Sequence, residues 1–240
     1  MSVSLPRVKV TLFVPTRNEV EGMKAIMPQV KKEWVDQILV VDGQSTDGTV
    51  EYAKSQGYDV VIQKKMGLRH AFIEGWPHIK GDVVITFSPD GNSPAGGIPP
   101  LIEKMKEGYD MVIASRYLEW AKSDDDDWIT GFGNWMFTRI VNILHGAKYT
   151  DAMVMYRAYR TNLFYELDLH KEESYAPEKW WCTILGIEPL LSVRAAKRKL
   201  KLGEIPCDEP ARIGGVRKLQ IIRWGGAYLT QFFREIFYWK

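Results

Sequence analysis

Short apolar segments alternate with helical segments through the first half of the chain, and this alternation limits the possible folds more than any other feature. Strands joined by helices of this length require right-handed crossovers and a parallel sheet that is covered on both faces. The pattern therefore predicts an α/β fold with a doubly wound, mainly parallel sheet. Strands are predicted at residues 8–14, 37–42, 58–62, 82–87 and 110–114, with helices at 20–32, 49–56, 68–76 and 101–107.

The second half of the chain has fewer strand-like runs. We predict a helix over residues 129–144, a short strand over 152–156 and mainly helix over 177–202. The acidic run at residues 124–127 is expected to be a solvated loop, because like charges repel and stay exposed. No repeat or low-complexity linker separates the two halves. We therefore expect them to form one domain.

Composition excludes several classes of protein. Lys and Arg number 32 against 30 Asp and Glu, a net charge of +2 that gives no reason to expect a nucleic-acid partner. Two cysteines, Cys182 and Cys207, suit neither a disulfide framework nor a metal cluster, and favour a reducing, cytoplasmic setting. No uncharged run reaches the roughly 18–20 residues needed to cross a bilayer. Residues 1–6 are too short and polar to predict a signal peptide.

Polar residues follow four of the predicted strands, at residues 15–19, 42–49, 88–94 and 115–117. In doubly wound sheets the ligand lies beyond the carboxyl ends of the strands. The chain lacks both G-x-G-x-x-G and G-x-x-x-x-G-K-[ST] in this context, which removes the main support for a dinucleotide oxidoreductase or a P-loop NTPase. Asp42 could accept hydrogen bonds from a nucleobase or a ribose, or could be only a turn residue.

These strand-end motifs, taken in order with Met66-Gly67-Leu68-Arg69-His70-Ala71, Thr150-Asp151, Glu188 and Glu204-Ile205-Pro206, resemble family 2 glycosyltransferases of the GT-A fold. The nearest branch is the dolichyl- or polyprenyl-phosphate mannosyl- and glucosyltransferases, and the resemblance covers about residues 8–218. It implies a GT-A domain over residues 1–218, with a nucleotide-sugar half at 8–117 and an acceptor half at 118–218.

The resemblance implies that a hexose moves, with inversion, from a GDP-mannose or UDP-glucose type donor to a polyprenyl phosphate. One alternative is transfer to a hydroxyl of a lipid-linked glycan or polysaccharide precursor. Another is a degenerate relative that binds nucleotide or membrane without turnover. The family pattern would assign the donor to Pro15, Thr16, Glu19, Asp42, Asp90, Arg212 and Lys218.

A divalent ion, Mg²⁺ or Mn²⁺, is implied at the D-x-D motif of the family. Here Ser88 stands in place of the first Asp, which leaves Asp90 and Asn92 as the expected metal ligands. Mg²⁺ tolerates one or two protein ligands when substrate phosphates and waters complete its octahedron. Gly43 is a second departure, at a position where the family often has an acid.

On the acceptor side the family pattern implies that Arg116 contacts the acceptor phosphate, and Arg157 is a second candidate. Gly133 and Asn134 occupy the region where the family carries another acceptor arginine. A phosphate dianion needs no general base, since its second pKa is near 6. An alcohol acceptor would need a base, for which Asp151 is the candidate, unless Asp151 only holds Arg157 or caps a turn. The predicted catalytic residues are Asp90, Arg116 and Asp151.

The C-terminal residues 219–240 predict an amphipathic helix. Wound at 100° per residue, the segment places Tyr228, Phe232, Phe233 and Phe237 on one half and Gln231 and Glu235 on the other. Its aromatic and basic content favours contact with a membrane interface over packing on its own domain. We expect a peripheral protein on the cytoplasmic face of a membrane, with a homodimer or a membrane-protein partner as alternatives.

Overall fold

A computed structural model of the chain describes residues 8–213 and 221–239, and its sheet has seven strands in the order β3-β2-β1-β4-β6-β5-β7. Neighbouring strands are parallel except where β6 pairs with β4 and β5. The α/β, mainly parallel prediction is therefore confirmed. The strands are β1 Val10–Thr16, β2 Gln37–Asp42, β3 Asp59–Ile62, β4 Val83–Thr86, β5 Met111–Ser115, β6 Arg157–Arg160 and β7 Leu202–Pro206.

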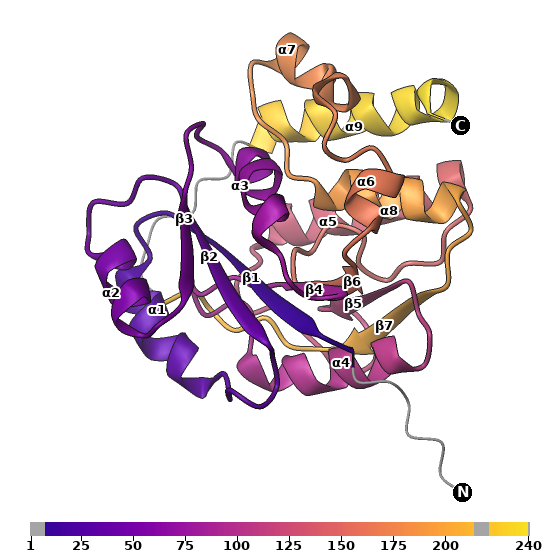
Figure 1. The fold of residues 1–240 in the computed structure, drawn as a ribbon. Helices are drawn as coiled ribbons and strands as arrows, with labels where there is room; N and C mark the ends of the chain where they lie inside the picture. Colours follow the sequence, from indigo (N-terminus) through magenta and orange to yellow (C-terminus); the bar gives the residue numbers. More distant parts are fainter. Residues whose placement is uncertain (1–7, 214–220, 240) are drawn as a thin grey trace, which may run out of the picture.

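Helices cover both faces of the sheet, with α1, α2 and α4 on one side and α3, α5 and α8 on the other (Figure 1). The central strands β1, β2, β4 and β5 are buried almost throughout, as expected for strands covered on two faces. The α-helices are α1 Val20–Ile26, α2 Thr49–Ser55, α3 Leu68–Gly75, α4 Ile98–Lys106, α5 Trp128–His145, α6 Leu163–Glu166, α7 Pro177–Trp181, α8 Glu188–Lys197 and α9 Ile221–Tyr238. Short 3₁₀ turns are η1 Met27–Gln29, η2 Trp76–His78, η3 Ala95–Gly97 and η4 Glu172–Tyr175.

Two strands differ from the prediction. The predicted strand at residues 152–156 lies instead at Arg157–Arg160, and it runs antiparallel between β4 and β5. Because this four-residue strand begins and ends with arginine, it contains no apolar run that would predict a strand. The last strand, β7, lies at the end of the segment predicted to be mainly helical. Its Gly203 faces the ring of Tyr109 so closely that a Cβ atom would lie 2.8 Å from it, which explains a glycine within the strand.

The acidic run at residues 124–127 is not simply a solvated loop, and that expectation is corrected. Asp127 caps α5, with its carboxylate accepting from Thr130 N at 2.8 Å in a capping box. Asp126 accepts from Tyr117 Oη and from Asn134 Nδ2, and Asp125 accepts from Asn92 Nδ2 at 3.0 Å. These hydrogen bonds therefore fix the conformation of the segment that leads into α5.

The C-terminal helix α9 packs against α5, α7 and α8 of the same domain (Figure 1). Its Glu235 is fully buried and pairs with the fully buried Arg194 of α8, with Nε and Oε2 2.9 Å apart. Gln231, expected on the polar half of the helix, is also buried, whereas Phe233 and Phe237 are exposed. The helical wheel was therefore wrong for Gln231, Glu235, Phe233 and Phe237, although Phe232 of its apolar half is buried. One face of α9 is thus part of the core.

Within residues 8–213 and 221–239, no helix is both long enough and apolar enough to cross a bilayer.

Candidate functional site

A cavity of about 660 Å³ opens at the carboxyl ends of β1, β2 and β3. Pro15 and Thr16 of β1 line it, as predicted for the donor site, together with Gly43 and Gln63 beyond the next two strands. Parallel register places Thr16 directly beside Asp42. The other walls come from α3, the segment before α8 and the first turns of α9, with the lining residues Gly67, Leu68, Ile184, Gly186, Glu188, Trp224 and Tyr228.

Asp42 is fully buried behind this cavity. Its carboxylate accepts hydrogen bonds from Thr16 Oγ1 at 3.1 Å, Ser45 N at 2.8 Å and Ser45 Oγ at 2.5 Å. Both oxygens are thus engaged in fixing the turn after β2. Glu19 stands at the N-cap of α1, where its backbone N–H donates to Thr49 Oγ1. Neither carboxylate is among the groups that line the cavity.

The loop after β4 carries Asp90, which is almost fully buried and forms an ion pair with Arg212, with Nη1 and Oδ2 3.0 Å apart. The backbone reinforces this contact, because Ile213 N donates to Asp90 O at 2.6 Å. Asp90 and Arg212, which lie far apart in the sequence, are therefore brought together, but neither is among the residues that line the first cavity. Lys218, the other cation of that prediction, lies outside the described residues.

Asn92 supplies a second oxygen on the same loop. Its Nδ2 donates to Asp125, but its buried Oδ1 has no hydrogen-bond partner among residues 8–213 and 221–239. Asp90 Oδ1 accepts from Asn92 N at 3.2 Å, so the two side chains are held next to each other. No group of three or more acidic, His or Cys residues suitable for a metal occurs among the described residues. Asp90 and Asn92 fit a Mg²⁺ or Mn²⁺ ion only if phosphate oxygens and waters supply the remaining ligands.

Arg116, at the end of β5, is held by two carboxylates. Its Nε and Nη2 donate to Asp151 at 2.6 and 3.1 Å, and its Nη1 donates to Glu209 Oε2 at 3.1 Å. Burial alone would raise the pKa of Asp151, but the Arg116 guanidinium outweighs it and the pKa is lowered. Asp151 is fully buried with both oxygens bonded. Asp151 orients Arg116 and also caps the turn after itself, because Met153 N and Val154 N donate to its Oδ1 at 3.2 Å. Its role as a general base stays a prediction, and its hydrogen bonds among the described residues do not include Arg157.

The expectation that Arg157 contacts the acceptor phosphate is also corrected, because its guanidinium cannot reach such a phosphate in this arrangement. Arg157 is the first residue of β6, and its side chain is fully buried. The guanidinium donates to the carbonyl oxygens of Val154 and Glu188 and to Ser192 Oγ, the last at 2.9 Å. Burial lowers the pKa of Arg157. The residue braces α8 against the sheet, which is a structural role.

A second cavity, of about 270 Å³, lies between α5 and α9. Arg116, Asp126 and Glu209 form its polar side, and burial raises the pKa of Glu209 although Arg116 acts in the opposite direction. The rest of its wall is mostly apolar. Four residues line both cavities, so the two spaces adjoin: Met153, Met155, Trp224 and Tyr228.

Glu188 was given no role by the sequence analysis beyond its place in the motif series. It begins α8, is 4% exposed and lines the first cavity, and its Oε1 atom has no hydrogen-bond partner in the part of the chain that the structure describes. Burial raises the pKa of its carboxyl. Besides the motif series, the sequence signal was an acid directly before a proline, within the segment predicted to be mainly helical. A buried carboxyl that lines a cavity and has one oxygen without a partner among the described residues is suited to hydrogen bonding with a polar ligand.

Comparisons with known proteins agree with this architecture. Residues 11–168 match the model of glycosyl transferase family 2. The chain is 29% identical over 228 residues to glycosyltransferase AglJ of Haloferax volcanii, covering 94% of this chain and 71% of AglJ. Glucosyl-3-phosphoglycerate synthase from Mycobacterium tuberculosis, in a complex with Mn²⁺, UDP and phosphoglyceric acid, superposes with a TM-score of 0.68 at 18% identity, covering 95% of this chain and 78% of that one. Its complex with Mg²⁺ and UDP gives a TM-score of 0.66 at 18% identity, with coverages of 95% and 79%.

Proposed function

Because the chain belongs to glycosyl transferase family 2 and has the GT-A fold, we propose that it transfers a hexose from a nucleotide sugar to a polyprenyl phosphate, with inversion at the anomeric carbon. One observation carries the proposal: two cavities share a wall, one beyond the strand ends and one between α5 and α9. The donor would enter the first and the acceptor the second. Their reacting atoms would then meet beside Met153, Met155 and Trp224.

The first cavity suits the donor. Pro15 and Thr16 would contact the nucleoside, with Asp42 and Glu19 supporting the surrounding loops. Glu188 lies on the α8 side of the same cavity, where its carboxyl would hydrogen-bond to hexose hydroxyls. Arg212, held beside Asp90, would neutralise charge on the diphosphate. A Mg²⁺ or Mn²⁺ ion at Asp90 and Asn92 would supply positive charge to the leaving diphosphate.

The second cavity suits a lipid-borne acceptor. Its mainly apolar wall includes Ile129 of α5, which is also exposed at the surface. Arg116 lies at the polar side with two different types of contact: a bidentate pair with Asp151 and a single-nitrogen contact with Glu209. Asp151 would keep the guanidinium in place while Nη1 exchanges Glu209 for a phosphate oxygen. A phosphate dianion positioned in this way needs no base, so catalysis rests on orientation and charge.

A hydroxyl acceptor is the second candidate, and the carboxylates of the second cavity favour it. Asp126 and Glu209 both line this space, and the raised pKa of Glu209 makes its carboxylate a stronger base than an ordinary glutamate. Such a group could take the proton from an attacking alcohol. The acceptor would then be a hydroxyl of a lipid-linked glycan or polysaccharide precursor.

Transfer assays with radiolabelled GDP-mannose and UDP-glucose separate these candidates. Each donor is offered with a short polyprenyl phosphate or with a polyprenyl-linked glycan that presents only hydroxyls. We expect product with the phosphate, and Glu209→Gln should not reduce its rate. Product only with the glycan, together with a loss of about 10²–10⁴-fold in Glu209→Gln, would establish the hydroxyl reaction instead. Asp208→Asn is the matched control, because Asp208 lines neither cavity. Nucleotide binding without turnover would indicate a degenerate relative.

We also propose a peripheral position on the cytoplasmic face of a membrane. The exposed Ile222, Phe233 and Phe237 of α9 support it, since these side chains lie on the solvent side of a helix whose other face is buried. A homodimer or a membrane-protein partner would cover the same face.

A further inference from the structure

Three aromatic side chains form an exposed row along α5. Trp128, Phe132 and Trp135 are spaced four and three residues apart, which places them on one face of the helix. Their exposed fractions are 85%, 53% and 55%. The ring centroids of Trp128 and Phe132 are 6.2 Å apart, and those of Phe132 and Trp135 are 5.7 Å apart. Arg139 continues the row, with its Cζ 5.8 Å from the Trp135 ring centroid.

The α5 aromatic row, defined as Trp128, Phe132, Trp135 and Arg139, is not needed to attach the helix to the protein. The opposite face of α5 does that, with Thr138, Val141 and His145 buried and Phe137 packed against Phe232 of α9. The exposed fractions show that no segment within 8–213 or 221–239 covers the row. Exposed aromatic surface of this extent is typical of an interaction site.

We propose that the α5 aromatic row lies in the interface of a lipid bilayer and holds the second cavity open to a lipid-borne acceptor. The inference rests on the proposed function and deepens it. Ile129 connects the two features, since it lines the second cavity, is exposed, and follows Trp128 directly. An acceptor chain leaving the cavity past Ile129 would therefore meet the row.

The chemistry of the row suits the level of the lipid headgroups. Indole rings have an apolar body and a polar N–H, and they concentrate at the membrane–water boundary. Arg139, at the other end of the row from the acidic run, can pair with a lipid phosphate. The acidic residues at 124–127 lie beside Trp128 and would disfavour a strongly anionic surface there. Binding should therefore depend on aromatic insertion more than on net charge, and only weakly on salt.

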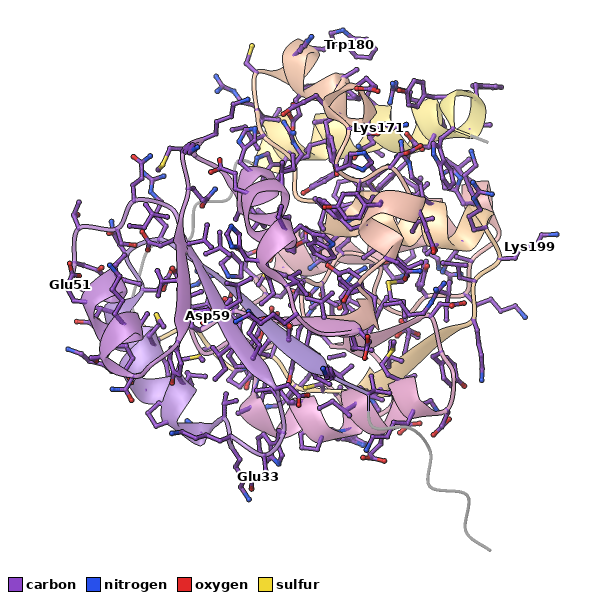
Figure 2. The ribbon with its side chains drawn as sticks, in the orientation of Figure 1. Glu33, Glu51, Asp59, Lys171, Trp180 and Lys199 are labelled. Carbon is purple, nitrogen blue, oxygen red and sulfur yellow. The ribbon has the colours of Figure 1, made fainter. Side chains whose placement is uncertain are left out.

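Sedimentation with sucrose-loaded phosphatidylcholine vesicles tests this surface in the full-length protein. The triple variant Trp128→Ser/Phe132→Ser/Trp135→Ser should lose about tenfold or more of its vesicle partitioning, because three exposed rings are removed. Trp180→Ser is the matched control, since Trp180 is 67% exposed at the outer edge of α7 (Figure 2) and should leave partitioning unchanged. Raising NaCl from 0.1 to 0.5 M should change wild-type partitioning less than twofold.

Several results would overturn the proposal. Unchanged partitioning of the triple variant, or an equal loss in Trp180→Ser, would remove the row from the membrane contact. Binding that disappears at 0.5 M NaCl would assign it to basic residues. If light scattering shows that the triple variant turns a dimer into a monomer while vesicle binding persists, the row is an interface between two copies of the chain. Circular dichroism and thermal melts confirm that each variant is folded.

Failure of this inference can be separated from failure of the proposed function. With a short polyprenyl phosphate in solution, the triple variant should keep wild-type transfer, whereas transfer to a long-chain acceptor embedded in vesicles should fall with its partitioning. If the wild-type protein transfers to neither phosphate, the proposed function is wrong. The vesicle measurement still decides whether the row binds lipid.

Discussion

Removing the carboxylate of Glu235 should severely destabilise the protein. Arg194 and Glu235 are both fully buried, and the guanidinium donates to the carboxylate through Nε at 2.9 Å and Nη2 at 3.0 Å. In Glu235→Ala the charge of Arg194 stays buried without its partner, which typically costs about 3–5 kcal/mol. The arginine keeps its Nη1 contacts to Leu167 O, Asp168 O and Ser174 Oγ, so its position is retained while its charge is not compensated.

Two companion variants isolate the charge from the packing. The double variant Arg194→Met/Glu235→Leu removes both charges and should be more stable than Glu235→Ala, because no uncompensated charge stays buried. It should remain about 1–3 kcal/mol less stable than wild type, because Leu167 O, Asp168 O and Ser174 Oγ lose the hydrogen bonds from Arg194 Nη1. Phe237→Ala, also on α9, changes an exposed side chain and should shift stability by no more than about 0.5 kcal/mol.

Urea unfolding followed by tryptophan fluorescence and circular dichroism provides the measurement. With a slope of about 2–3 kcal/mol per molar urea, a loss of 3–5 kcal/mol lowers the midpoint by roughly 1–2 M. The reasoning is refuted if Glu235→Ala moves the midpoint no further than Phe237→Ala does. It is also refuted if the double variant is as unstable as the single one. Deleting residues 223–240 should leave the domain unfolded or insoluble, for the same physical reason.

Further predictions concern the two cavities. Asp90→Ala should abolish transfer and EDTA should inhibit the wild type; full activity in EDTA would show that Arg212 and its neighbours neutralise the diphosphate without a metal. Arg116→Ala should raise KM for the lipid phosphate far more than KM for the nucleotide sugar in steady-state assays, and an equal rise in both would move Arg116 to the donor side. Because burial raises the pKa of Glu188, the folded state holds this proton more tightly than the unfolded state does. The free energy of unfolding should therefore fall as pH rises through and above the ordinary glutamate pKa, near 4.5. Glu188→Gln should remove that part of the fall in urea titrations between pH 4 and 8, and an unchanged slope would contradict a raised pKa of Glu188.

The sequence predicted the first half of the fold well for a physical reason. Parallel strands covered on both faces must be apolar throughout, so β1, β2, β4 and β5 appear as uninterrupted runs. The antiparallel β6 has only four residues and begins and ends with arginine, so periodicity could not reveal it. The faces of α9 were equally ambiguous, because its apolar side chains occupy both the buried and the exposed side.

The candidate site was predictable only in part. Strand ends and motif order correctly placed Pro15 and Thr16 at the first cavity, and the structure pairs Arg212 with Asp90, although neither of these two residues lines that cavity. The order of motifs in the sequence could not predict which carboxylates form ion pairs with a given arginine. Arg116 pairs with Asp151 and Glu209, which tertiary packing alone brings to it.

The position of β6 has a consequence for how the chain is made. β4 and β5 do not pair with each other, because β6 lies between them and is synthesised after both. At roughly 5–20 residues per second, a nascent chain therefore presents two unpaired strand edges for several seconds before β6 emerges to join them. Open edges of this kind are templates for intermolecular pairing. Joining β5 to the strands on the β4 side must thus follow translation of β6, and early release or stalling before Arg157 should yield an aggregation-prone fragment.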